Sequence, residues 1–289
     1  MTASHWLRYA LLTALAWGVW GAFTSLPSEH GFPDTLTYVV WALTMIAPAT
    51  WAMRRAGTPL NKDRRSIALG MAVGLLGAGG QMLLFHAVTI GPTYLVFPIV
   101  SLSPVITILL SLLLLGERTG RLGVIGIVLA VISLPLFDYS PGNGPHQYGA
   151  WFFLALGVML AWGLQAYYIK LANATMSAES IFFYMMITGL MFIPVALWLT
   201  DFSQPIYFGL SGPWLAAGVQ MLNAVGALLL VYAFRYGKAI VVSPLVNAGA
   251  PFLTTAIALA ISGTLPGGFK LAGAVLALAG ALLLSLQPG

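Results

Sequence analysis

The side chains best suited to chemistry in this sequence are neutral hydrogen-bonding and aromatic groups inside otherwise apolar stretches. Gln220 and Asn223 are three residues apart, as are Trp162 and Gln165, a spacing that places each pair on one face of a helix. Facing inward, such groups would give aromatic walls for stacking and amides for a polar end. The predicted small-molecule contacts are Trp17, Trp20, Gln81, His86, Phe97, Ser101, Trp162, Gln165, Tyr168, Asn223, Ser243 and Asn247.

Each of these side chains has a second interpretation, because polar groups inside membrane helices also hold neighbouring helices together. A polar stripe fits packing about as well as it fits a cavity. Trp17 and Trp162 are favoured as ligand contacts because they recur at equivalent places in the chain. Trp6, Trp151 and Trp214 stand at the ends of apolar segments and are interpreted as interfacial anchors.

Charged groups are nearly absent from the middles of these segments. His86 is the exception, and a ligand contact, a pH response and a hydrogen-bonded structural role all remain open for it. Glu117, with Arg118 and Arg121, is interpreted as a cytoplasmic surface cluster, with gating as the alternative. No Asp or Glu lies mid-segment, which favours a facilitator over a proton-coupled carrier, although coupling through His86 stays open.

The sequence gives little support to a catalytic or cofactor-dependent function. Gly209-Leu210-Ser211-Gly212 has the shape of an intramembrane serine hydrolase motif, but no histidine follows His146 to activate the serine. The chain has no cysteine and no clustered metal ligands, so neither a metal nor a cofactor is expected. The net charge of +5 is ascribed to membrane topology rather than to nucleic-acid binding.

The elements that position these residues must be membrane helices. Sixty per cent of the chain is hydrophobic and 7% is charged, against about 25% charged in soluble domains. A span needs about 20 apolar residues. The hydropathy pattern predicts an all-α integral membrane protein with ten transmembrane helices near 6–26, 35–53, 66–89, 93–115, 122–138, 148–172, 178–200, 212–236, 239–262 and 269–287.

Lys and Arg predict how these helices are oriented, because cytoplasmic loops retain basic residues. With the N terminus inside, eleven of the twelve basic residues fall on the cytoplasmic side, and Lys270 is the exception. Both termini are then cytoplasmic. The first segment is expected to be a retained helix rather than a cleaved signal. The predicted location is the bacterial-type inner membrane, crossed many times.

Two copies of a five-helix unit are predicted, over 1–140 and 141–289. Leu15-Ala16-Trp17-Gly18 recurs 145 residues later as Leu160-Ala161-Trp162-Gly163. Further matches follow at offsets of 146 and then 147, among them Leu83-Leu84, Gly91, Val96, Val100, Thr107, Gly116 and Gly126. An odd number of helices inverts the second copy, which is typical of secondary transporters.

Prolines also recur between the copies. Pro98, Pro104, Pro244 and Pro251 are predicted to kink equivalent helices and to serve as hinges, whereas Pro48 and Pro194 are interpreted as unpaired kinks. One chain would thus hold its own inverted pair and act as a monomer in the bilayer.

The chain resembles the drug/metabolite transporter superfamily, specifically its ten-helix EamA-type exporters. Ala16-Trp17-Gly18, the stretch from Pro98 to Pro104, and Gly116-Glu117-Arg118 followed by Gly126 carry the resemblance; the second copy departs from it with Gly263-Thr264 in place of Gly-Glu. The aromatic-rich first and sixth segments are similar to those of the superfamily's aromatic amino-acid exporters. The resemblance implies export of aromatic amino acids and related amphiphilic metabolites; another metabolite or drug, or uptake, remains open.

Overall fold

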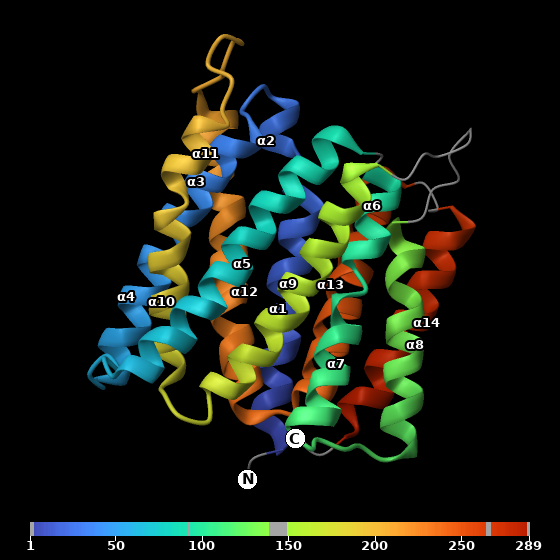
Figure 1. The fold of residues 1–289 in the computed structure, drawn as a ribbon. Helices are drawn as coiled ribbons and strands as arrows, with labels where there is room; N and C mark the ends of the chain where they lie inside the picture. Colours follow the sequence, from blue (N-terminus) through green and yellow to red (C-terminus); the bar gives the residue numbers. More distant parts are fainter. Residues whose placement is uncertain (1–2, 92, 139–148, 264–266, 288–289) are drawn as a thin grey trace.

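The computed structural model describes residues 3–91, 93–138, 149–263 and 267–287, and these ranges contain helices and connecting turns but no strand (Figure 1). The elements are α1 (Ala3–Phe23), α2 (Leu26–Glu29), α3 (Asp34–Thr44), α4 (Ile46–Ala56), α5 (Arg64–Ile90), α6 (Thr93–Val100), α7 (Ser103–Leu114), α8 (Arg121–Asp138), α9 (Ala150–Ala172), α10 (Ala178–Met191), α11 (Ile193–Trp198), the π-turn η1 (Leu210–Trp214), α12 (Leu215–Tyr236), α13 (Ala239–Ser262) and α14 (Gly268–Ser285).

Eight helical spans in the described ranges are long and apolar enough to cross a membrane. Two shorter apolar helices, Ser103–Leu114 and Arg121–Leu136, occupy the places of the fourth and fifth predicted segments. Large apolar side chains are exposed along the outside of the bundle, for example Leu113, Phe153 and Val275. A surface of this kind suits lipid rather than water. The chain is therefore a multi-pass helical membrane protein.

Helix ends coincide with local capping signals. Asp63 precedes α5 and accepts the backbone N–H of Ser66 over 3.0 Å. Hydrogen bonds from the side chain and then the backbone of Ser66 hold the pKa of the Asp63 carboxyl below its usual value. Ser177 caps α10 in the same way through the N–H of Ser180. Gly57 ends α4 in the left-handed region at φ +62°, where a side chain would strain the backbone.

Three predicted helices are broken just before a proline. The breaks fall at Met45 ahead of Pro48, at Phe192 ahead of Pro194, and at Ser101–Leu102 ahead of Pro104. Proline removes a backbone donor and clashes with the preceding turn, so the helix restarts around it. Interpreting Pro48 and Pro194 as unpaired was wrong, because they are 146 residues apart and follow equivalent breaks.

The other paired prolines lie in a helix that is broken in the first copy and continuous in the second. Pro104 is in the first turn of α7, after the α6–α7 break, whereas Pro244 and Pro251 lie inside the unbroken α13. Pro98 lies in α6. Between the matched valine and proline there are three residues in the first copy, after Val100, and four in the second, after Val246. The hinge role of these four prolines stays a prediction.

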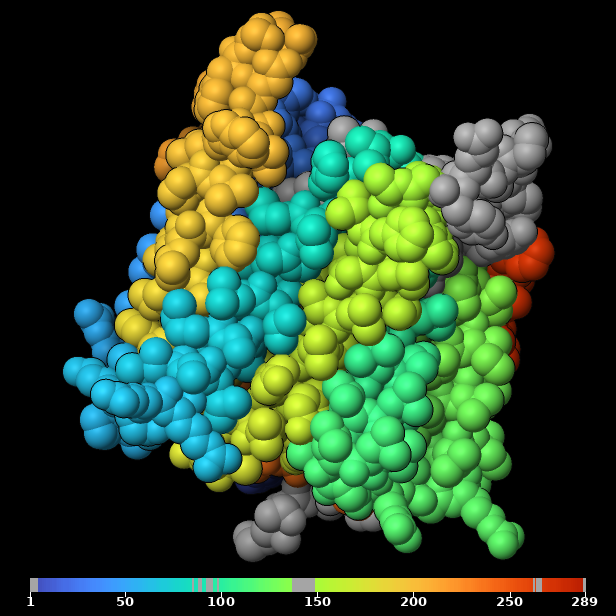
Figure 2. Space-filling model, in the orientation of Figure 1, coloured from blue at the N-terminus to red at the C-terminus, as the bar shows by residue number. Residues whose placement is uncertain are grey.

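Close helix contacts concentrate on α1 and α9. Helix α1 packs against α12 and α13, while α9 packs against α5, α6 and α7. Figure 2 shows α9 lying between α5 and α7 on one face of the molecule. The glycines of α5 permit close packing on two sides: Gly70 and Gly74 face Tyr184 and Thr188 of α10, and Gly77 and Gly80 face α9.

The two ends of the bundle differ in charge. Helix α1 begins and α14 ends at the same end of the bundle, together with the α4–α5, α7–α8 and α9–α10 connections (Figure 1). We call this the basic end, because Arg54, Arg55, Arg118 and Arg121 lie in or beside those connections. The opposite end has the α2–α3 connection and the loop after α11, with Glu29 and Asp201.

We expect the basic end to face the cytoplasm. The chain has no cysteine, so single cysteines can be placed without background. Thr58→Cys, exposed at the basic end, should react with a membrane-impermeant maleimide only in inside-out vesicles, and Gln204→Cys, exposed at the opposite end, only in intact cells. If each position reacted only from the other side, the predicted orientation would be reversed. If both reacted from the same side, the assignment of the spans between them would be contradicted.

Candidate functional site

Two tryptophans of α1 meet two amides of α12. The indole N–H of Trp17 donates to the backbone carbonyl oxygen of Asn223 over 3.3 Å, and its ring lies against Gly226. The indole N–H of Trp20 donates to Oε1 of Gln220 over 3.2 Å, and Nδ2 of Asn223 donates to the same oxygen over 3.4 Å. Gln220 is 4% exposed. We call Trp17, Trp20, Gln220 and Asn223 the indole–amide cluster.

A related contact joins α9 to α5. The indole N–H of Trp162 donates to the carbonyl oxygen of Gly77 over 3.3 Å, and its ring lies against Gly80. The amide of Gln165 covers Gly77 from the same helix face. A side chain at either glycine would displace these groups, so the glycines allow α9 and α5 to approach closely.

The two contacts occupy equivalent positions. Trp17 and Trp162 are 145 residues apart, and their partners Asn223 and Gly226 lie 146 residues after Gly77 and Gly80. The glycines that follow the two tryptophans also make equivalent contacts. The Thr254 hydroxyl donates to the carbonyl oxygen of Gly18 over 2.9 Å, and the Thr107 hydroxyl donates to that of Gly163 over 3.1 Å. The recurring Trp-Gly pair thus docks α1 and α9 onto two helices each.

The polar groups of the two contacts are not equivalent. Gln220 corresponds to Gly74, and Trp20 corresponds to Gln165. Two linked side-chain amides therefore occur between α1 and α12 but not between α9 and α5. Helical spacing had placed Gln220 on one face with Asn223, but only Asn223 was among the predicted contacts.

The remaining predicted contacts are scattered through the bundle. Nδ2 of Asn247 donates to the carbonyl oxygen of Ser243 over 2.9 Å, and Ser243 is 1% exposed. The rings of Tyr168 and Tyr167 meet edge to face at 5.3 Å. The other four differ in exposure: Gln81 and Ser101 are half-buried, whereas His86 and Phe97 are exposed. Their role as ligand contacts stays a prediction.

The terminal tryptophans correct one expectation. Trp6 and Trp151 are 0% and 6% exposed, so interpreting them as interfacial anchors was wrong. Trp6 covers Gly237 between α12 and α13, and Trp151 covers Gly91 between α5 and α6. These are again equivalent places, 145 and 146 residues apart. Trp214 is 70% exposed, as an anchor would be.

Glu117 also departs from its interpretation as a surface residue. Its side chain is 9% exposed, and its Oε2 accepts the backbone N–H of Ile240 at the start of α13 over 3.0 Å. Arg118 and Arg121, expected to cluster with it, are exposed. The carboxylate therefore points into the bundle and contacts a helix 123 residues further along the chain.

The described helices thus form an apolar bundle in which paired tryptophans dock α1 and α9 against their neighbours. The chain belongs to the EamA-like transporter family, whose model matches residues 5–137 and 149–286. Family membership makes the chain a transporter of the drug/metabolite transporter superfamily and gives no support to a hydrolase based on Ser211.

Similar proteins include the pseudopaline exporter CntI of Pseudomonas aeruginosa, 28% identical over 195 residues. That match spans 66% of this chain and 65% of the exporter, slightly under two thirds of its length. The uncharacterized protein MJ1333.1 of Methanocaldococcus jannaschii is 27% identical over 45% of this chain and 93% of its own length. A solved crystal structure with 18% identity covers 96% of this chain and 98% of its own at a TM-score of 0.76, so the fold is shared.

Proposed function

We propose that this protein is a secondary transporter that exports small amphiphilic metabolites, foremost aromatic amino acids and related compounds, across the inner membrane by alternating access. Family membership and the similarity to a protein named as an exporter support transport and its direction. The equivalent contacts 145–147 residues apart support two inverted copies, over 1–140 and 141–289, in a carrier that acts as a monomer. The basic end is then cytoplasmic.

The indole–amide cluster is the observation that carries the cargo proposal. Oε1 of Gln220 already accepts two hydrogen bonds. Among the described residues, nothing bonds Nε2 of Gln220 or Oδ1 of Asn223, so an amide NH2 group and an acceptor oxygen remain for a ligand. Trp17 and Trp20 lie beside them and offer faces on which an aromatic ring stacks. Trp162 and Gln165 of α9 extend this proposed site.

Reconstituted protein decides whether the cargo is aromatic. Proteoliposomes loaded with tryptophan or phenylalanine should release either amino acid about tenfold faster than protein-free liposomes, and should retain a loaded sugar. Equal release of amino acid from both preparations would refute the aromatic cargo. Movement of pseudopaline in its place would favour a cargo like that of the relative from Pseudomonas aeruginosa.

A further inference from the structure

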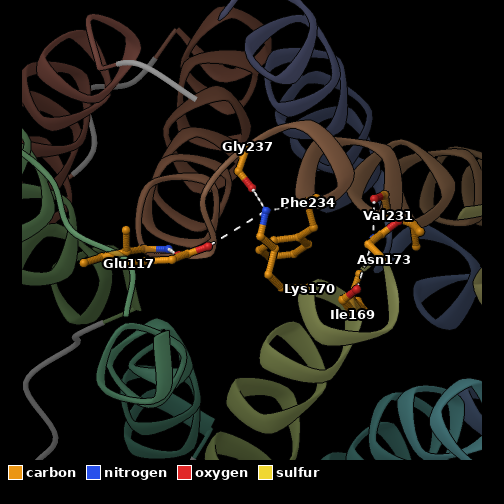
Figure 3. Close-up of polar contacts among 8 residues, drawn as sticks. Glu117, Ile169, Lys170, Asn173, Val231, Phe234 and Gly237 are labelled. Carbon is orange, nitrogen blue, oxygen red and sulfur yellow. Dashed lines mark hydrogen bonds and ion pairs between the residues drawn. The ribbon is translucent and has the colours of Figure 1, made fainter. Parts of the chain in front are cut away.

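Lys170, near the end of α9, binds the turn between α12 and α13. Its ammonium group donates to the carbonyl oxygens of Phe234 over 3.0 Å and Gly237 over 2.6 Å, as Figure 3 shows. The last carbonyl groups of a helix lack partners within the helix and carry a partial negative charge. The lysine therefore satisfies the end of α12 and joins α9 to it at the basic end.

Glu117 binds the other side of the same turn. Its Oε2 accepts the N–H of Ile240 in the first turn of α13, where backbone donors are free and an anion is favoured. Its Oε1 lies 3.9 Å from Nζ of Lys170. Each charge thus contacts the helix end that favours its sign. Together they tie the α7–α8 connection, α9 and the α12–α13 turn into one closed group.

Among the described residues of the opposite end, the equivalent positions form no such tie. The residue 145 positions before Lys170 is Ser25, whose hydroxyl donates to Glu29 four residues on rather than to another part of the bundle. The residue that matches Glu117 is Thr264, which has no charge and lies outside the described residues. Lys170 and Glu117 therefore distinguish the two ends of an otherwise repeated structure.

The two ends also differ in burial: residues at the basic end are more buried than their equivalents at the opposite end. At the basic end of α13, every residue from Ala239 to Val246 is buried, so protein surrounds these two turns on all sides. Ser243 is 1% exposed, whereas Phe97, the equivalent residue 146 positions earlier, is 37% exposed at the opposite end. Gly237 is buried and its equivalent Gly91 is only half-buried.

We propose that Lys170 and Glu117 form the cytoplasmic gate of this carrier, that the closed group at the basic end marks an outward-facing conformation, and that these contacts hold it as the resting state. The proposal rests on the proposed alternating-access function and its orientation. To open the gate, Lys170 must leave two carbonyl oxygens and Glu117 must leave the N–H of Ile240. Loss of either charge removes part of that cost and shifts the population toward the inward-facing conformation.

Cysteine reporters in the Cys-free chain test the gate without any cargo. Ser243→Cys should be protected from a membrane-impermeant maleimide in inside-out vesicles, and Phe97→Cys should react from outside. With Lys170→Gln or Glu117→Gln added, labelling at position 243 should become about tenfold faster, and labelling at position 97 should slow. Lys238→Gln is the matched control, because Lys238 lies in the same turn and its ammonium group makes no hydrogen bond or ion pair with a described residue. Its charge repels that of Lys170, so its loss should not weaken the gate.

Each outcome has a definite consequence. The gate proposal is overturned if both gate variants leave position 243 protected, or if Lys238→Gln accelerates its labelling equally. Thermal melting in detergent identifies a gate variant that has lost its fold. In that case, the labelling result of the other gate variant decides. A labelling shift in a protein that moves no aromatic amino acid would refute the cargo but keep the gate. Transport of aromatic amino acids by a protein that shows no labelling shift would keep the cargo but refute the gate.

Discussion

Gly163→Ala is expected to destabilise the bundle severely, although it adds a single methyl group. A Cβ at this position would lie 2.5 Å from Cβ of Ile106 and 2.7 Å from the carbonyl oxygen of Ser103. Neither atom is the end of a flexible side chain, so α9 and α7 would have to separate. The hydrogen bond from Thr107 to the Gly163 carbonyl would be disturbed with them. Overpacking typically costs about 1–3 kcal/mol, and a clash with backbone belongs at the upper limit.

The matched change Gly18→Ala should act in the same way on the other side of the bundle. A Cβ there would lie 2.5 Å from Cβ of Leu253 and 3.1 Å from the carbonyl oxygen of Ala250. Gly218→Ala in α12 is the control, because its Cβ would meet no atom within 4 Å. A helical glycine replaced by alanine without a clash gains about 0.5–1 kcal/mol.

Melting temperature and monodisperse yield in detergent measure these effects. Gly163→Ala and Gly18→Ala should each melt well below the parent protein, and Gly218→Ala should melt at or slightly above it. If Gly163→Ala melted like the parent, the close contact between α9 and α7 would not exist as described. If only one of the two glycines were sensitive, the docking of α1 and α9 would not be equivalent.

Hydropathy predicted the helical segments because crossing lipid constrains each helix by itself. The predicted range 239–262 coincides with α13, and 178–200 covers α10 and α11. Repeat matches could likewise predict that Trp17 and Trp162 act in pairs, since an equivalent residue meets an equivalent environment. Kinks were predicted at Pro48 and Pro194, but hydropathy could not show that the helices divide at Met45 and Phe192, because a proline interrupts a helix without making it polar.

Contacts between distant residues were beyond what the sequence could predict. Trp6 has the position of an interfacial anchor, but Gly237, more than 230 residues later, determines that it is buried. Glu117 next to two arginines has the pattern of a solvated cluster, and only the arrival of Ile240 and Lys170 turns it inward. Helical spacing placed Gln220 and Asn223 on one face without showing that α1 covers that face.

Gln220→Met is expected to impair transport far more than stability. Methionine has nearly the volume of glutamine and is readily buried in an apolar helix. The substitution removes both the acceptor for Trp20 and Asn223 and the donor offered to a ligand. Trp20 is only half-buried, so its indole N–H keeps access to water. A hydrogen bond lost from a ligand's polar group weakens binding by about 1.4 kcal/mol, or tenfold.

Tryptophan transport in proteoliposomes, measured over a range of concentrations, should show this as a KM about tenfold higher for Gln220→Met. Asn223→Leu should have a similar effect, because Oδ1 of Asn223 is the acceptor left for the ligand. Ser133→Ala is the control: it removes a buried hydroxyl from α8 whose hydrogen bond goes to Ala130 of the same helix. Parent-like kinetics in both amide variants would place the binding site elsewhere and leave the indole–amide cluster as a packing contact, whereas a raised KM with an unchanged melting temperature is a result that a packing role cannot produce.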